Sequence, residues 1–502
     1  MKSTFVPINT IPYEVLSTIP DYWVDRDPMD NNTADDGMAA NNTADRNLIT
    51  LTHVCHNWRE LFISRPSLWT NLDCTNVEKT RVYIERSKSC LLKVYLWDDD
   101  DDECVFPDAA FLLTIPHLGR LGSLSLIGFD EAFVELVNKH FNRPAPFLEK
   151  LRIRFYAGPH AITAEIFDGN LPSLQELFLT GVLTNLPWRN LANITKFDFC
   201  HVPSDGISVT QLLDFFEHAP LLSIIRLHNA FPDTSNAPPG RVVSLTSLKK
   251  FRIIAQPAHS ILLNHLLIPS GALLVLEFDF DSEESPIPAY LPKDLQNLQN
   301  LSPITSIDLS YKSGVSLRLN GPSGGLYVLG TWTGAATFPP AVHSRILHSL
   351  NHLGILVTER FMISAYSTPS PLHIQKPPPY RTLLPMNALH TIILINCRNI
   401  PFISALDPSG ISRTLVCPKL EELVLYIKKK EWFCINELLK MAEERSSRGV
   451  GLSTITIFSS EEFVPAKEVL KLRDLVSCVE YRLPVWDEIP DGIRYPGYES
   501  DW

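Results

Sequence analysis

The chain has 502 residues, and with 45% hydrophobic and 20% charged side chains it can bury a substantial core. That length fits two or three ordinary domains, or one small module followed by an elongated array. The 44 basic and 56 acidic residues give a formal net charge of −12 without a long Lys/Arg run, so we expect no nucleic-acid partner.

The nine cysteines are odd in number and form no Cys-x-x-Cys pair, which is typical of mostly buried thiols in a reducing compartment. No run reaches the roughly 20 apolar residues of a membrane span, and the opening MKSTFVPINTIPYEVL has no continuous apolar stretch. We therefore expect no membrane partner, no secretory signal, and a cytoplasmic and/or nuclear location.

Near the N-terminus two segments have helical patterns. Ile11-Pro12-Tyr13-Glu14-Val15-Leu16 places a proline at a plausible first helical position and apolar residues behind it. From Leu48 apolar residues recur at three- and four-residue steps, which predicts one amphipathic helix that ends at Arg65-Pro66. A short turn carrying Leu68 and Trp69 follows.

These residues resemble the F-box, a small helical module that docks a substrate receptor onto the Skp-family adaptor of a cullin-RING ubiquitin ligase. The matching motifs are Ile11-Pro12-x-Glu14-Val15-Leu16, Val54-Cys55-x-x-Trp58-Arg59 and Pro66-Ser67-Leu68-Trp69. With a leucine-rich chain behind it, the module looks like the large fungal set of F-box-like proteins. The resemblance implies adaptor contacts by Ile11, Pro12, Val15, Leu16, Leu51, Val54, Cys55, Trp58 and Leu61, with Leu68 and Trp69 packing the module.

Residues 1–72 are thus predicted to form an all-helical module with an insertion at about 24–47. The insertion contains Asn-Asn-Thr-Ala-Asp twice, and because it is acidic with little to bury we expect it to be disordered. Pro20 should end the first helix early. This departure leaves open an alternative, a degenerate F-box that no longer docks.

Residues 73–115 form a linker in this interpretation. It comprises a short helix from Val77 to Ser89, an alternating strand from Leu91 to Leu96, and an acidic loop from Asp98 to Glu103. Six consecutive acids without turn residues are more typical of a solvated loop than of a cation site.

From residue 116 to about 480 the pattern Leu-x-x-Leu-x-Leu recurs, with other apolar residues replacing some leucines. Eleven copies begin at Leu118, Leu148, Leu174, Ile194, Leu222, Leu248, Leu273, Ile304, Leu389, Leu420 and Leu452. In the wide gap before Leu389, Leu353 to Val357 is interpreted as a degenerate copy. This is the leucine-rich-repeat pattern, so we predict an irregular right-handed α/β solenoid with parallel strands on its concave face.

Three segments depart from the repeat. Residues 314–332 alternate around Asn320 to Gly325 and predict a β-hairpin grafted on the array. The proline-rich residues 368–385 predict an extended loop, in which Pro377, Pro378 and Tyr380 match a short WW-domain ligand or belong to an ordinary loop. Residues 481–502 form an acidic, aromatic tail.

No residue set predicts catalysis or metal binding. Gly321-x-Ser323-Gly324-Gly325 resembles the nucleophile loop of a serine protease, but the sequence has no companion His and Asp motifs. A hairpin turn explains these residues better. His348 and His352 lack the intervening Glu of a metalloprotease. We therefore expect no cofactor and no enzyme activity.

Taken together, the sequence predicts the substrate-recognition subunit of an SCF-type cullin-RING ubiquitin ligase. The module would bind a Skp-family adaptor, and the repeats would bind an unidentified protein substrate for ubiquitin-dependent degradation. The alternative is a non-ligase interaction scaffold.

Overall fold

The computed structural model describes residues 45–482 with internal gaps, and residues 1–44 and 483–502 lie outside the described part. The longest gaps are 98–107, 280–290, 332–356 and 366–382. The chain divides between Leu222 and Ser223 into two units, each of which is described by itself.

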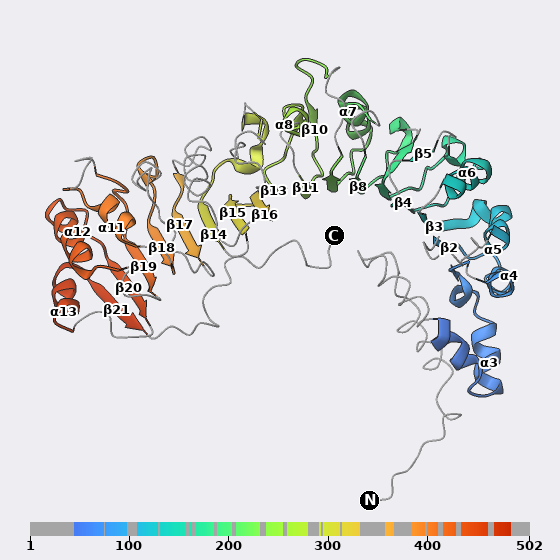
Figure 1. The fold of residues 1–502 in the computed structure, drawn as a ribbon, viewed down its shortest axis with the longest axis horizontal. Helices are drawn as coiled ribbons and strands as arrows, with labels where there is room; N and C mark the ends of the chain where they lie inside the picture. Colours follow the sequence, from blue (N-terminus) through green and yellow to red (C-terminus); the bar gives the residue numbers. More distant parts are fainter. Residues whose placement is uncertain are drawn as a thin grey trace, which may run out of the picture. The chain divides into compact units, whose positions relative to one another are not determined.

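The first unit begins with helices and continues as alternating strands and helices (Figure 1). A helix at residues 45–52 precedes α3 (His56–Ile63), η2 (Pro66–Trp69), β1 (Asn71–Leu72), α4 (Val77–Arg86), β2 (Leu92–Trp97), α5 (Asp108–Leu112), η3 (Ile115–Arg120), β3 (Leu121–Gly128), α6 (Glu131–His140), β4 (Lys150–Phe155), β5 (His160–Ile162), η4 (Ile166–Gly169), β6 (Glu176–Thr180), β7 (Val182–Thr184), η5 (Trp188–Asn190), β8 (Lys196–Cys200) and α7 (Val209–His218).

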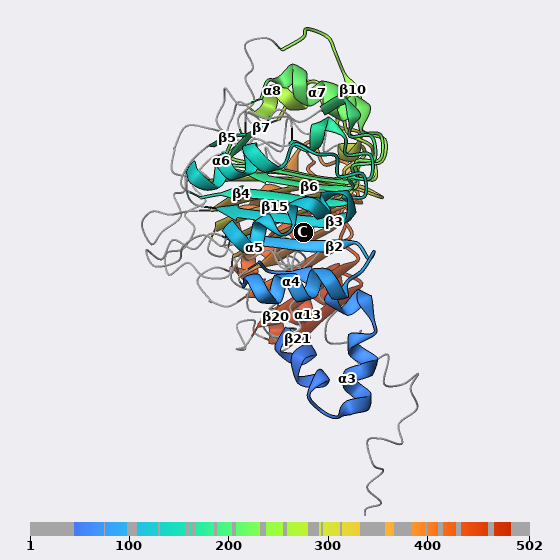
Figure 2. The same cartoon turned by 90° about the vertical axis from the view of Figure 1, so that its right-hand side faces the viewer.

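Strands β1, β2, β3, β4, β6 and β8 pair in that order, and every pairing is parallel. Helices α4, α5 and α6 lie along one side of these strands (Figures 1 and 2). In β4 buried Leu151, Ile153 and Phe155 alternate with half-buried basic residues. Each fully buried Leu, Ile or Phe contributes about 1.5–3 kcal/mol, so the inward row of apolar residues holds each strand to the helix side.

The first helical segment differs from the prediction of one continuous helix. Residues 45–52 and α3 are separate, because His53 and Val54 bond to carbonyls three residues back and Cys55 is extended with φ −161°. Arg59 Nε donates to the Thr52 carbonyl at 3.0 Å, which satisfies one of the unpaired carbonyls at the end of the first helix. The break turns Val54 out of the apolar stripe that the periodicity predicted.

The second unit continues the same pattern. It contains β9 (Ile224–His228), β10 (Val243–Ser244), β11 (Lys250–Ile254), α8 (His259–Leu263), β12 (Leu266–Leu267), β13 (Leu273–Asp279), η7 (Leu295–Asn297), η8 (Gln299–Leu301), β14 (Ser306–Tyr311), β15 (Gly314–Asn320), β16 (Gly325–Thr331), β17 (Arg360–Ala365), β18 (Thr391–Ile395), α11 (Ile400–Leu406), β19 (Glu422–Ile427), α12 (Ile435–Ser447), β20 (Thr454–Ser459), α13 (Ala466–Leu475) and β21 (Cys478–Arg482).

The hairpin at residues 314–332 lies within the sheet and is not an appendage to it. Strand β16 pairs with β13 in parallel, β15 is antiparallel to both β16 and β14, and β14 pairs with β17 in parallel. The chain thus folds β14, β15 and β16 into a meander that occupies successive places in the row of strands. Strand β15 is the one antiparallel member of this sheet in the described residues.

All eleven repeat copies coincide with strands that pair in parallel with a neighbour, which confirms the predicted parallel strands. The wide gap before Leu389 is filled differently from the prediction. Its strand is β17, with Phe361 and Ile363 buried, and it begins three residues after Val357. Leu353 to Leu356 lie outside the described residues.

Candidate interaction surfaces

The residues predicted to contact an adaptor fall into three groups. Ile11, Pro12, Val15 and Leu16 lie outside the described residues, as do Pro377, Pro378 and Tyr380 of the possible WW ligand. Leu51, Trp58 and Leu61 are buried, each 5% exposed, and Cys55 is half-buried. Val54 is exposed at 44%, as is Ile49, a neighbour that the sequence pattern did not select.

Trp69 anchors the helical segment to the first repeat. Its indole Nε1 donates to the carbonyl of Phe62 at 3.0 Å, and its ring meets Tyr83 of α4 edge-on with centroids 5.0 Å apart. The Arg86 guanidinium lies 4.3 Å from the indole centroid. Trp69, 1% exposed, therefore joins α3 to α4, and Leu68 beside it is also buried.

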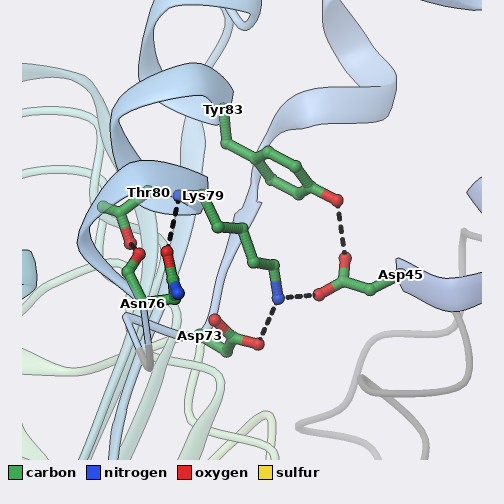
Figure 3. Close-up of polar contacts among 6 residues, drawn as sticks. All are labelled: Asp45, Asp73, Asn76, Lys79, Thr80 and Tyr83. Carbon is green, nitrogen blue, oxygen red and sulfur yellow. Dashed lines mark hydrogen bonds and ion pairs between the residues drawn. The ribbon is translucent and has the colours of Figure 1, made fainter. Parts of the chain in front are cut away.

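A second connection is ionic and is drawn in Figure 3. Lys79 Nζ of α4 lies between the carboxylates of Asp45 and Asp73, and the Tyr83 hydroxyl donates to Asp45 at 3.2 Å. Asn76 caps α4 by accepting from the backbone N–H of Lys79 at 3.0 Å. Because Asp45 begins the helix at 45–52, this network fixes that helix against α4.

Asp45 corrects the predicted extent of the acidic insertion. The insertion was expected to reach about residue 47, yet Asp45, Arg46 and Asn47 are helical and the Asp45 side chain is 15% exposed. Burial raises the pKa of Asp45, and the hydrogen bond and charge of Lys79 oppose that rise. Burial alone would lower the pKa of Lys79, but hydrogen bonds and charges from Asp45 and Asp73 outweigh it, and its pKa is raised.

We call the side of the strands that points away from the inward apolar rows the strand face. In the first unit it carries Lys93, Tyr95 and Trp97 on β2; Ser123, Ser125 and Ile127 on β3; Lys150, Arg152 and Arg154 on β4; Glu176, Phe178 and Thr180 on β6; and Lys196, Asp198 and Cys200 on β8. Glu176 forms ion pairs with Lys150 at 3.8 Å and with Lys196 at 3.2 Å. This face is therefore polar, with aromatic rings among the charges.

The strand face of the second unit has a polar part around the meander. Asp308 of β14 pairs with Arg360 of β17 at 3.2 Å and lies opposite Arg318 of β15 in the register. Burial raises the pKa of Asp308, opposed by the charges of Arg360 and Arg318. On the neighbouring strands Arg252 pairs with Glu277 at 2.7 Å.

The strand face of the second unit also has an apolar part, which extends from β17 to β20. Met362, Ile395, Val424 and Tyr426 form a buried cluster with Ile393 and Phe458 packed against it. The Tyr426 and Phe458 rings stack with centroids 4.2 Å apart and planes 5° apart. These six residues, hereafter the apolar cluster, occupy strand-face positions and not the inward positions that hold the repeats together.

Three further candidates concern catalysis, metal binding and a cavity. Ser323 is exposed in the hairpin turn, and its hydroxyl donates to the Ser270 carbonyl at 3.4 Å. No group of His, Cys, Asp and Glu among the described residues could hold a metal, and His348 and His352 lie outside them. A cavity of about 440 Å³ beside α7 is lined by Trp188, Arg189, Asn190, Gln211 and Asp214, where Arg189 and Asp214 already form an ion pair at 2.7 Å.

Sequence reasoning missed the strand-face residues, although the signal was present. In Lys150-Leu151-Arg152-Ile153-Arg154 the apolar residues predict the core side of a strand, and the alternating charged residues mark its opposite face. The ion pair between Lys79 and Asp45 has no local sequence signal, because the two residues are 34 positions apart in the chain. None of the helices in the described residues is both long and apolar enough to cross a membrane.

The chain was compared with protein families, curated proteins and solved structures. No protein-family model matches the chain, and no curated protein matches it. Among solved structures, an internalin from Listeria monocytogenes matches with 11% identity and a TM-score of 0.25, over 73% of this chain and 82% of that one. At that score the match describes a similarity only, and the assignment of a repeat array rests on the strand pairing and the inward apolar rows.

Proposed function

We propose that this chain is a non-enzymatic substrate receptor of an SCF-type cullin-RING ubiquitin ligase. Its N-terminal helical module docks a Skp-family adaptor, and the strand face of its repeat array binds a protein target. Its contribution to ubiquitin transfer is to position that target, because the chemistry belongs to other subunits.

The observation that carries target binding is the half-buried part of the apolar cluster on β17 to β20, formed by Ile393 and Phe458; the other four members of the cluster are buried. Inward residues already bury the core of each repeat, so the packing of the strands does not require half-buried Ile393 and Phe458 on the other face. Apolar and aromatic residues at such positions are typical of the central part of a protein interface.

Adaptor docking is supported by the motif residues and by two exposed side chains. Ile49 and Val54 present apolar surface next to the helix break, whereas Leu51, Trp58 and Leu61 pack inside the module. The buried residues then shape the module, and Val54 is the most exposed described member of the predicted contact set.

Co-purification with the adaptor tests the proposal. The wild-type chain should retain a Skp-family adaptor, and the double variant Ile49→Asp, Val54→Asp should not, because two charges would be buried in an apolar interface. A matched control changes two exposed apolar residues elsewhere, Val242→Asp and Leu470→Asp, and should retain the adaptor.

The scaffold alternative predicts a different result. If the folded wild-type chain retains no adaptor, the module is a degenerate F-box and the array acts as an interaction scaffold outside the ligase. If the Ile49, Val54 variant retains the adaptor as well as wild type does, docking through this surface is wrong.

A further inference from the structure

The strand face of the first unit has the opposite charge to the protein as a whole. Its fifteen positions, set by the strand register, hold five basic residues and two acidic ones, for a net charge of +3, in a chain of net charge −12. The basic residues are Lys93, Lys150, Arg152, Arg154 and Lys196. Helices α4, α5, α6 and α7 of the same unit together carry seven acidic residues and four basic ones (Lys or Arg), so the excess of positive charge lies on the strands and not on these helices.

Two arginines at the centre of this face are held by aromatic rings. The Arg152 guanidinium lies 4.9 Å from the Phe178 ring centroid on the next strand. Arg154 lies 5.7 Å from the Tyr156 ring centroid and donates from Nη1 to the Tyr156 hydroxyl at 3.0 Å. A guanidinium that covers a ring with its face keeps N–H groups along its edge, and these can donate to a carboxylate in bidentate geometry.

Arg154 makes no ion pair with an acidic side chain in the described part of the chain. By contrast, Lys150 and Lys196 both pair with Glu176. By cross-strand row, the net charge is +2 where Lys93, Lys150 and Lys196 face Glu176, zero where Arg152 and Asp198 lie, and +1 where Arg154 lies. The face therefore keeps an excess of positive charge.

We propose that this face binds an acidic protein segment. Arg152 and Arg154 donate hydrogen bonds to the carboxylates of that segment. This inference deepens the proposed function, because it states the kind of target that the strand face accepts. The two arginines are two residues apart on one strand, or about 7 Å, which matches acidic residues at alternate positions of an extended segment.

Aromatic side chains lie beside the arginines on the same face. Tyr95 and Trp97 of β2 are in register with Ser125 and Ile127 of β3, which are in register with Arg152 and Arg154. Two strand spacings separate the aromatic pair from the arginine pair, about 9–10 Å. An acidic segment with aromatic or apolar residues beside its carboxylates fits this arrangement.

Nucleic acid is the other polyanion that could bind a basic face. The charge of the chain disfavours it, because an overall −12 repels an extended phosphate backbone and only five basic residues lie on this face. The face also has two acidic residues of its own, Glu176 and Asp198.

Fluorescence anisotropy with the full-length chain tests the proposal. The probe is a labelled peptide of alternating Glu and Thr, and a peptide of alternating Lys and Thr is the control probe. The acidic peptide should bind at low ionic strength, and binding should weaken with added salt. The variant Arg152→Glu, Arg154→Glu should weaken it at least about tenfold, because two attractions become repulsions.

Two further variants control for folding and for overall charge. Arg152→Gln, Arg154→Gln removes both positive charges without adding negative ones and should weaken binding by a smaller factor. Lys139→Glu, Arg143→Glu makes the same change in charge at exposed positions outside the strand face and should bind like wild type.

The proposal fails if the Arg152, Arg154 charge reversal binds the acidic peptide as tightly as wild type, or if the Lys139, Arg143 control loses as much. It also fails if an oligothymidylate of equal charge binds as tightly as the peptide. Adaptor retention by the same samples separates this failure from failure of the proposed function, because the peptide assay contains no adaptor.

Discussion

The indole of Trp69 stands edge-on to the ring of Tyr83, with centroids 5.0 Å apart and planes at 85°. This contact joins the helical module to the first repeat and fixes the position of the module on that repeat. Under the proposed function, this contact would keep an adaptor-bound module in a fixed place on the first repeat.

Replacing Trp69 with Phe should destabilise the first unit. The change removes the indole donor to the Phe62 carbonyl, a buried hydrogen bond of 3.0 Å that contributes about 0.5–1.5 kcal/mol, while the Arg65 N–H keeps its bond of 3.3 Å to the same carbonyl. Denaturant unfolding of the full-length chain measures this loss. Trp97→Phe is the matched control, because the Trp97 Nε1 has no hydrogen-bond partner to lose in the described structure, and its unfolding midpoint should stay near that of wild type.

Replacing Lys79 with Met should leave two carboxylates without their shared cation. The expected loss is up to about 3 kcal/mol, because removing one member of a buried ion pair leaves the other uncompensated. Arg81→Met on the same helix removes only an exposed pair with Glu78 and should change little.

The loss in the Lys79 variant should depend on pH. Without the cation that opposes burial, the pKa of Asp45 rises further, so the folded state binds a proton more tightly than the unfolded state. Acidification therefore favours the folded variant, and its deficit relative to wild type should be smaller at about pH 5 than at about pH 8. Equal deficits at both pH values would show that Asp45 is not the uncompensated charge.

Replacing Gly325 with Ala should disrupt the meander. A Cβ at Gly325 would lie 2.3 Å from the Leu319 carbonyl oxygen, a backbone atom that cannot move without breaking the β15 and β16 pairing. We expect a loss of about 1–3 kcal/mol or more in the unfolding free energy of the second unit. Gly271→Ala, where a Cβ would meet nothing within 4 Å, should leave the unfolding free energy unchanged or slightly raised.

Much of the array could be predicted from sequence, because each repeat carries its own signal. Alternation in segments such as Leu420 to Leu425 places apolar residues inward whatever the rest of the chain does. The position of β16 next to β13 could not be predicted in this way, because it depends on long-range pairing that Gly324 and Gly325 allow.

The helical module was harder to predict for a related reason. Periodicity treats residues 48–65 as one helix, but hydrogen bonds at His53 and Val54 close the first helix early and expose Val54. The end of the acidic insertion was also misplaced, because Asp45 gains its order from Lys79, a partner far along the chain. Local patterns determine which residues are buried, and distant partners determine where elements end.

The most direct test of the account is a calorimetric titration of the full-length chain with a purified Skp-family adaptor. The account predicts one adaptor per chain with a Kd of about 1 μM or tighter, weakened at least tenfold by Ile49→Asp, Val54→Asp. A folded wild-type chain that gives no binding heat at several temperatures, and no complex on size-exclusion chromatography, would contradict the ligase assignment.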